Sequence, residues 1–339
     1  MRIALRAPNW IGDAVMALPA LAALRRAFAE DEVTLVGPGG VTALFAEVHD
    51  AQPSRVLTLE GTSAGRTARA LAAGRFDRIV LFTNSFGSAW AARRAGIRER
   101  WGYGARGRSL LLTRAVARPG RHERGHHADY YRVLAARVGA TDGLDAAPRL
   151  AASEATRAFS ADTLARARVD ATRPLAVLAP GAAYGHAKRW LPERYADVAA
   201  RLVRERGMTV ALTGADGDRD AGRAIESWLG THAPVERPAV VNLIGAPGGV
   251  RGLIGLLALA RLVIANDSGA AHVAAALRVP TVTIFGPTDE RVSAPIGPGV
   301  ALSHDVFCRP CMLRDCPIDH RCMKRITADT VYARAEDLL

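Results

Sequence analysis

The chain has 339 residues, of which 49% are hydrophobic and 23% are charged. This composition excludes a disordered chain, and the length is suitable for two domains. The 45 basic and 33 acidic residues give a formal net charge of +12, which favours an anionic partner. No apolar run is long enough to span a membrane, and the first residues lack a signal sequence, so we expect a cytoplasmic protein.

Short apolar segments alternate with helical patterns in the first part of the chain. Strands are expected over 2–6, 33–36, 56–59 and 78–82, and helices over 14–28, 64–73 and 85–95. Such alternation predicts a parallel sheet with right-handed crossover connections.

Residues 140–173 contain few bulky apolar side chains, and we place a domain junction there. The alternation then restarts, with strands expected over 175–178, 209–212, 240–243, 262–265 and 281–285, and helices over 192–206, 253–260 and 269–277. The predicted organisation is an N-terminal α/β domain over 1–168 and a second doubly wound α/β domain over 172–326. A C-terminal helix over 327–339 is expected to pack back on the first domain.

The loop after the first expected strand contains a carboxylate, Asp13, preceded by Gly12 and Trp10. Ligands of open α/β sheets bind beyond the carboxyl ends of the strands, so this loop is a candidate site. Asp13 has two interpretations at this stage. It is either a helix N-cap or a general base that takes a proton from a hydroxyl group.

Two loops of the second domain have the composition of anion sites. Gly181 and Lys188 follow the strand over 175–178, where backbone N–H groups and an ammonium group can surround a phosphate. Lys188 and Lys324 are the only lysines in a chain rich in arginine, which suggests a specific use for the ammonium group.

The second of these loops follows the strand over 262–265 and opens a helix. It carries Asp267, Ser268, Gly269 and His272, and a helix N-terminus with small residues is well suited to an anion. A plain helix cap with a buried His272 is the alternative.

Three carboxylates follow the strand over 209–212. An acidic residue in this position commonly binds ribose hydroxyl groups in doubly wound folds. We favour Asp218, with Asp216 and Asp220 as alternatives.

All four cysteines lie close together near the C-terminus, at positions 308, 311, 316 and 322. The spacing of Cys308, Cys311, Cys316 and Cys322 allows a structural zinc site, although only the first pair forms a CxxC motif. An iron–sulfur site or plain reduced thiols are the alternatives.

Positive charge is concentrated between Arg93 and Arg124, where ten arginines stand against two glutamates. This segment is either a solvated surface or a binding surface for an anionic partner. Nucleic acid is not expected, because only Trp101 and Tyr103 could stack on bases there.

Taken together, these motifs resemble the ADP-heptose-dependent lipopolysaccharide heptosyltransferases of glycosyltransferase family 9, most closely the heptosyltransferase II group. The resemblance is carried by the segments 9–13, 180–181 with 187–190, 266–269 with His272, 285–288, and the cysteine cluster. It implies the GT-B fold, in which two Rossmann-like domains face each other across a cleft.

The resemblance also implies roles for individual residues. Asp13 is then the catalytic base, and the acceptor-binding residues are expected among Trp10, Gly12, Arg93 and Arg94. The donor, ADP-heptose, is expected to bind to the second domain through residues that include Gly181, Lys188, Asp218, Asp267, Ser268, Gly269 and His272.

The resemblance further implies an inverting transfer of L-glycero-D-manno-heptose to the inner core of lipopolysaccharide, with no metal or other cofactor required for catalysis. The acceptor is anionic, and the enzyme is expected to contact the inner membrane peripherally. Two alternatives remain: another GT-B nucleotide-sugar enzyme, such as an epimerase or a transferase with a different acceptor, and a basic nucleic-acid-binding protein.

Overall fold

The computed structural model describes residues 1–61, 63–105, 107–120 and 125–339. The chain forms two compact units, Met1–Leu150 and Ala151–Leu339. The division falls within the segment 140–173 in which the junction is expected, but ahead of the expected domain bounds at 168 and 172.

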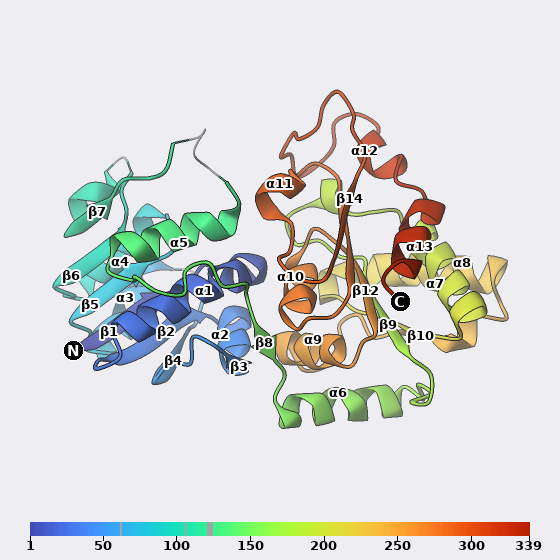
Figure 1. Ribbon diagram of the computed structural model, residues 1–339, viewed down its shortest axis with the longest axis horizontal. Helices are drawn as coiled ribbons and strands as arrows, with labels where there is room; N and C mark the ends of the chain where they lie inside the picture. Colours follow the sequence, from blue (N-terminus) through green and yellow to red (C-terminus); the bar gives the residue numbers. More distant parts are fainter. Residues whose placement is uncertain (62, 106, 121–124) are drawn as a thin grey trace. The chain divides into compact units, whose positions relative to one another are not determined.

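The first unit is built around strands that alternate with helices (Figure 1). Its elements are β1 (Arg2–Arg6), α1 (Ile11–Ala27), β2 (Glu32–Pro38), α2 (Gly39–Phe45), β3 (Val48–His49), β4 (Arg55–Leu59), α3 (Ala64–Ala73), β5 (Arg78–Leu81), α4 (Phe86–Arg94), β6 (Glu99–Tyr103), a 3₁₀ turn (Arg108–Leu111), β7 (Arg114–Val116) and α5 (His127–Arg137). The short β8 (Leu150–Ala151) pairs with β3 at the end of the unit.

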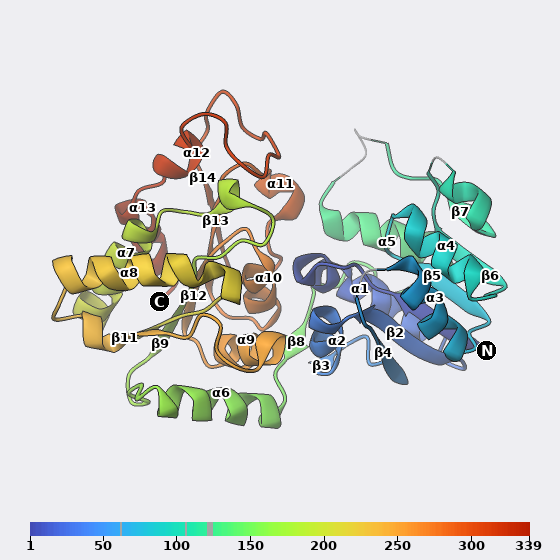
Figure 2. The same ribbon diagram turned by 180° about the vertical axis from the view of Figure 1, so that it is seen from behind.

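The six long strands of the first unit are parallel and lie in the order β4-β2-β1-β5-β6-β7. Counted within the unit, this is the order 3-2-1-4-5-6 of dinucleotide-binding folds. Helices α1 and α5 pack together on one face of the sheet, and α3 and α4 pack together on the other (Figures 1 and 2). The apolar strand β1 lies in the middle, with Ile3, Ala4 and Leu5 fully buried.

The second unit repeats this plan. Its elements are α6 (Glu154–Arg166), β9 (Leu175–Ala179), a 3₁₀ turn (His186–Lys188), α7 (Pro192–Arg206), β10 (Thr209–Leu212), a 3₁₀ turn (Asp216–Asp218), α8 (Arg219–His232), a 3₁₀ turn (Arg237–Ala239), β11 (Val240–Asn242), α9 (Gly249–Ala258), β12 (Leu262–Asn266), α10 (Gly269–Ala276), β13 (Thr281–Phe285), α11 (Glu290–Ser293), β14 (Gly299–Ser303), α12 (Arg321–Lys324) and α13 (Ala328–Glu336).

The sheet of the second unit is also parallel, in the order β11-β10-β9-β12-β13-β14. Helix α7 packs against α8 and α13, and α9 packs against α6 and α10. The central strands β9 and β12 are buried along their whole length, as expected of parallel strands covered on both faces.

The C-terminal helix differs from the expectation that it packs on the first domain. Helix α13 contacts α7 and β13 of the second unit, and its residues Val331, Tyr332 and Ala335 belong to that unit's apolar core.

Helix α6 fills the segment in which the sequence suggested only a junction. It approaches α9 closely at Gly255, where an added Cβ would overlap with the side chain of Ser160 and the carbonyl of Thr156. Its buried face is made of Thr156, Ser160 and Leu164, so it carries almost no hydrophobic periodicity. This is why the pattern of apolar residues did not predict it.

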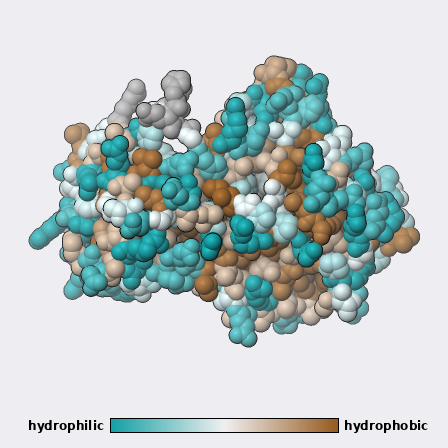
Figure 3. Space-filling model, viewed as in Figure 1, coloured by the Kyte–Doolittle hydropathy of each residue, from teal (hydrophilic) through white to brown (hydrophobic). Residues whose placement is uncertain are grey.

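No helix among the described residues is long and apolar enough to cross a membrane. The face of the molecule in Figure 3 mixes hydrophilic and hydrophobic residues on both units.

Candidate functional site

The two central strands of the second sheet, β9 and β12, pair directly although they are far apart in the sequence. After β9 the chain adds β10 and β11 on one side of it. The chain then crosses over and adds β12, β13 and β14 on the other side, so the strand order reverses between β9 and β12. Ligands of open α/β sheets bind outside the carboxyl ends of the strands at such a reversal. The loops after β9 and β12 therefore form the candidate site.

A buried amide, that of Asn266, holds these two loops together. Asn266 is fully buried at the end of β12 and donates from Nδ2 to the carbonyl of Pro180 at 2.7 Å. Its Oδ1 accepts from the backbone N–H of Trp190 and from the hydroxyl of Tyr195, each at 3.0 Å. Three groups, two from the loop after β9 and one from helix α7, thus meet on one side chain, which fixes the loop after β9.

Lys188 forms an ion pair with Asp267 in this site. Its Nζ lies 2.6 Å from Asp267 Oδ2, and the two side chains are only 13% and 5% exposed. The hydroxyl of Thr288, in the loop after β13, donates to the same carboxylate oxygen at 2.6 Å. The buried charge of Asp267 is therefore both paired and hydrogen-bonded, as low-dielectric surroundings require.

The start of α10 has the properties of an anion site. Ser268 is the N-cap residue, but its side chain makes no capping bond, and its buried Oγ has no hydrogen-bond partner among the described residues. Gly269 opens the helix, and His272 lies on its buried side. Backbone N–H groups at a helix start and a hydroxyl without a partner are together a favourable place for phosphate oxygens.

Among the three carboxylates after β10, the structure places only Asp218 beside the loop after β9. Asp218 is 9% exposed, accepts from the N–H of Ala215 and pairs with Arg189 at 3.0 Å. A Cβ at Gly181 would overlap with the Asp218 carboxylate, so the glycine allows this close approach.

The other two carboxylates of this group point elsewhere. The exposed side chains of Asp216 and Asp220 pair with Arg219 and Arg223 on their own helix.

In the first unit, Asp13 lies in the first turn of α1, beyond the carboxyl end of β1. The N-cap position belongs to Trp10, whose side chain makes no capping bond, so Asp13 does not have the N-cap role considered above. Burial raises the pKa of Tyr131 well above 10, and the charge of Asp13 and a hydrogen bond to it raise it further. The Asp13 carboxylate therefore faces a buried tyrosine hydroxyl of α5.

A buried arginine lies in the same region of the first unit. Arg6, at the end of β1, is 8% exposed and donates to the carbonyl of Ala7 and to Asn9 Oδ1. Burial lowers its pKa to about 10, and no carboxylate among the described residues pairs with it. At the end of β5, the buried hydroxyl of Thr83 has no partner in the described part of the chain.

Of the remaining candidates for acceptor binding, Trp10, Arg93 and Arg94 are exposed and Gly12 is partly buried. Trp10 is 55% exposed, Gly12 lies beside it at the start of α1, and Arg93 and Arg94 occupy the last turn of α4. Arg94 lies over the ring of Trp90, 6.0 Å from its centroid. Of the arginine-rich segment, Arg106, Arg121 and Arg124, together with Glu123, lie outside the described residues.

The four cysteines are free thiols, and Cys322 is buried. Burial raises the pKa of the Cys322 thiol. Among the described residues no group of three His, Cys, Asp or Glu side chains is arranged to hold a metal ion. The zinc site is not tested by this arrangement and stays a prediction.

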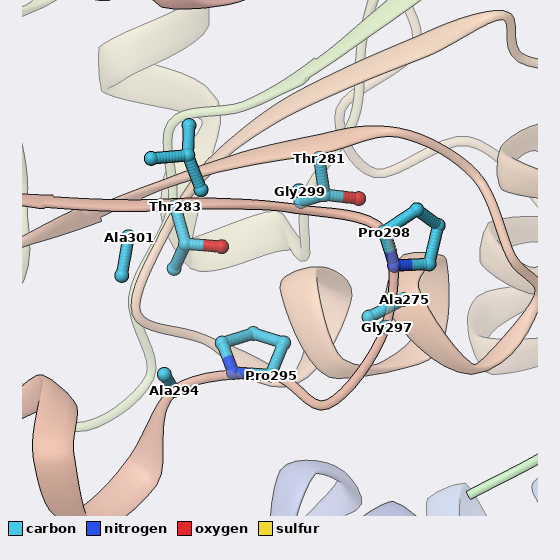
Figure 4. Close-up of a pocket in the computed structure, with 10 residues that line it drawn as sticks. Ala275, Thr281, Thr283, Ala294, Pro295, Gly297, Pro298, Gly299 and Ala301 are labelled. Carbon is cyan, nitrogen blue, oxygen red and sulfur yellow. The ribbon is translucent and has the colours of Figure 1, made fainter. Parts of the chain in front are cut away.

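A hollow of the second unit lies away from these loops (Figure 4). It is lined by small side chains at the beginnings of β13 and β14 and the end of α10. No charged side chain lines it, so it offers nothing to a phosphorylated ligand.

Comparison with known proteins identifies the family. A family model described as glycosyltransferase family 9 (heptosyltransferase) matches residues 64–321. The chain belongs to glycosyltransferase family 9. A family 9 relative, lipopolysaccharide heptosyltransferase 2 of Salmonella typhimurium, is 30% identical over 87% of this chain and 86% of its own length. The predicted enzyme class, a heptosyltransferase, is confirmed.

Solved structures of family 9 enzymes share the architecture. The structure of E. coli ADP-heptose lps heptosyltransferase II matches with a TM-score of 0.82 and 26% identity, covering 100% of this chain and 98% of that one. E. coli heptosyltransferase WaaC is described with ADP and with ADP-2-deoxy-2-fluoro heptose. These two structures match with TM-scores of 0.73 and 0.69 at 18% and 20% identity over the whole of both chains. The predicted GT-B fold is confirmed.

Four residues around these loops were not predicted: Asn266, Thr288, Tyr131 and Arg6. Asn266 and Thr288 stand in segments that carried the family resemblance, but their roles depend on which loops meet. A basic residue at the end of a buried apolar strand was the available signal for Arg6.

Proposed function

We propose that this family 9 enzyme transfers L-glycero-D-manno-heptose from ADP-heptose to the inner core of lipopolysaccharide, with a heptosyltransferase II-type acceptor. The observation that carries the donor assignment is the start of α10. There the Ser268 hydroxyl has no hydrogen-bond partner among the described residues and makes no capping bond to the helix, next to the Lys188–Asp267 pair. ADP and an ADP-heptose analogue in the WaaC structures support the same ligand class.

The donor diphosphate binds at the loops after β9 and β12 in this proposal. The N–H groups of α10 and the Ser268 hydroxyl stabilise charge that develops on ADP as it leaves. Lys188 contributes by orienting Asp267, while Gly181, Gly269 and His272 shape the pocket around the diphosphate and sugar. Asp218 is assigned to the ribose, because Asp216 and Asp220 are exposed.

The transfer is a direct displacement that inverts the anomeric centre. The acceptor oxygen forms a bond to the anomeric carbon, the bond from that carbon to the diphosphate oxygen breaks, and ADP leaves. Asp13 accepts the proton of the acceptor hydroxyl. Neither a metal nor another cofactor is needed for this step, so we expect turnover to persist in the presence of a chelator.

The first unit binds the acceptor in this proposal. The exposed Trp10 and the adjacent Gly12 contact its sugars, while the basic side chains of Arg93 and Arg94 attract its acidic groups. The same positive surface favours peripheral contact with the anionic cytoplasmic leaflet of the inner membrane.

The test is transfer from ADP-heptose to purified inner-core acceptors that differ by one heptose. We expect product only with the acceptor that already carries the first heptose, followed as a mass increase of one heptose unit. Turnover of the donor without acceptor would instead indicate an epimerase. Product on the heptose-free acceptor would contradict the heptosyltransferase II assignment.

A further inference from the structure

The cysteine-rich segment, residues 308–320, lies against the loop after β9. The backbone N–H of Ala187 donates to the carbonyl of Arg314 at 2.8 Å, and His320 Nε2 lies 2.8 Å from the carbonyl of Ala187. The hydroxyl of Tyr184 donates to the carbonyl of Met312 at 2.7 Å. These contacts fix the segment next to Lys188.

The same segment also contacts the loop after β13. The N–H of Met312 donates to the carbonyl of Pro287 at 2.9 Å. Arg309, whose side chain is 6% exposed, donates to the carbonyls of Gly286 and Thr288 at 2.8 and 2.9 Å. The hydroxyl of Thr288 in turn donates to Asp267, so a single residue, Thr288, links the cysteine-rich segment to the candidate donor site.

Most positive charges around these loops are already offset. Lys188 pairs with Asp267, Arg189 with Asp218, and Arg309 with Glu290. A bound diphosphate therefore gains little net attraction from any of these three cations.

Arg314 is different. No carboxylate pairs with it in the part of the chain that the structure describes, and its side chain is exposed. Its guanidinium carbon lies 5.3 Å from the centroid of the Tyr184 ring, and Lys188 Nζ lies 5.0 Å from the same centroid. The ring of Tyr184 thus contacts both Arg314 and Lys188, the lysine of the Lys188–Asp267 pair.

The backbone of Arg314 is held as closely as its side chain. A Cβ at Gly185 would overlap with the Arg314 carbonyl, so the glycine permits the two segments to touch. Stacking on an aromatic ring restricts a guanidinium group while leaving its N–H groups free to bind a phosphate.

We propose that Arg314 binds the diphosphate of the donor nucleotide, and that the cysteine-rich segment is a wall of the nucleotide site. This inference rests on the proposed function, which places a nucleoside diphosphate at the loops after β9 and β12. Arg314 supplies the positive charge that the paired side chains lack, through charge-assisted hydrogen bonds to phosphate oxygens.

The experiment compares Arg314→Gln with Arg321→Gln in the full-length chain. Arg321 is a matched control, because it lies just beyond the same segment, stacks on Phe307 and pairs with Asp319. Calorimetry with ADP and with adenosine measures the contribution of the phosphates separately. We expect Arg314→Gln to weaken ADP binding at least about tenfold, with adenosine binding and Arg321→Gln unchanged.

The outcomes separate this inference from the proposed function. Wild-type affinity for ADP in Arg314→Gln overturns the inference, and so does an equal loss for ADP and adenosine. An equal loss in both variants also overturns it. If the wild-type protein itself binds no ADP, the proposed function fails, and the assignment of Arg314 fails with it.

Discussion

The two units have the same strand order but different chemistry at the same place in the fold. In each sheet the first and fourth strands are neighbours, and a loop followed by a helix leaves their carboxyl ends. In the second unit these loops carry small residues around a buried, mutually neutralised pair, Lys188 and Asp267. In the first unit they carry a carboxylate beside a tyrosine, Asp13, and a buried cation, Arg6, which pairs with no carboxylate in the part of the chain that the structure describes.

The two units also differ in the exposure of the aromatic side chains in these loops. Trp10 and Phe86, which follow β1 and β5, are each 55% exposed, whereas Trp190 in the corresponding loop of the second unit is 1% exposed. Exposed aromatic faces suit the apolar faces of sugars, and a packed polar loop suits a diphosphate. One topology can therefore provide two dissimilar ligand sites, since the fold sets only where the loops gather.

The largest effect that we expect is a loss of stability in the second unit when its buried ion pair is broken. Asp267→Ala leaves the Lys188 ammonium buried without its partner, which costs about 3–5 kcal/mol. Hydrogen exchange should become faster at the amides of β9 and β12 and remain unchanged at those of β1 and β5.

A double substitution provides the control. Replacing both members of the pair, as Lys188→Met with Asp267→Leu, removes the unpaired charge, so most of the stability should return. If Asp267→Ala alone left exchange in β9 and β12 unchanged, the pair would not be the buried electrostatic element described here.

The next effect is on turnover and belongs to the first unit. Asp13→Asn keeps the shape of the side chain but removes the base, so transfer should fall at least about a hundredfold. ADP affinity, a property of the second unit, should not change. Steady-state transfer and ADP calorimetry measure the two quantities.

Asp31→Asn is the matched control, because Asp31 is a carboxylate of the same unit that pairs with the amino terminus. Turnover of Asp13→Asn close to that of this control would show that Asp13 has a structural role only.

The sequence was most informative where burial was greatest. The strands Leu175–Ala179 and Leu262–Asn266 are buried throughout, so they read as apolar runs and were predicted almost to the residue. The strand Glu99–Tyr103 and the edge strand Gly299–Ser303 carry mixed or half-exposed residues and were not predicted. Helix α6 was missed because it packs through small and polar side chains.

The sequence identified residues of the candidate site, but it did not show which of them contact one another. Lys188 and Asp267 were both expected to approach the donor, yet their ion pair joins residues 79 positions apart and depends on how β9 and β12 align. The arrangement of Asn266 is of the same kind, since its partners Pro180, Trp190 and Tyr195 are 71 to 86 positions away and the pattern of residues does not encode their meeting.

A smaller effect on turnover tests the surroundings of Asp13. Tyr131→Phe removes the buried hydroxyl that faces Asp13 and keeps the ring against Phe82. Transfer should fall about tenfold, because the base is less well oriented. Loss of a donor to the charged form should also move the acidic limb of the pH–rate profile to higher pH.

Tyr130→Phe is the control for this substitution, because the hydroxyl of Tyr130 donates to Asn84 Oδ1 at 3.1 Å. An unshifted pH profile in Tyr131→Phe would remove Tyr131 as a positioning residue and leave it a packing role.

The smallest effect concerns the pH dependence of stability in the first unit. His49 is 4% exposed, its Nδ1 accepts from the N–H of Ala51 at 3.1 Å, and its Nε2 lies 3.2 Å from the carbonyl of Phe45. A neutral ring satisfies both contacts, whereas a proton on Nδ1 breaks the first. Burial accordingly lowers the pKa of His49 below 6.5.

The sign of the effect follows from proton binding. Below pH 6.5 the unfolded chain takes up a proton at this position before the folded chain does, so stability is lost as the pH falls. We expect stability to fall as the pH is lowered from 7 to 5, seen as faster hydrogen exchange in helix α2 and in β3. In His49→Gln this pH dependence should disappear, although the variant is less stable at pH 7. If wild type and His49→Gln lost stability equally on acidification, the titrating group would lie elsewhere in the unit.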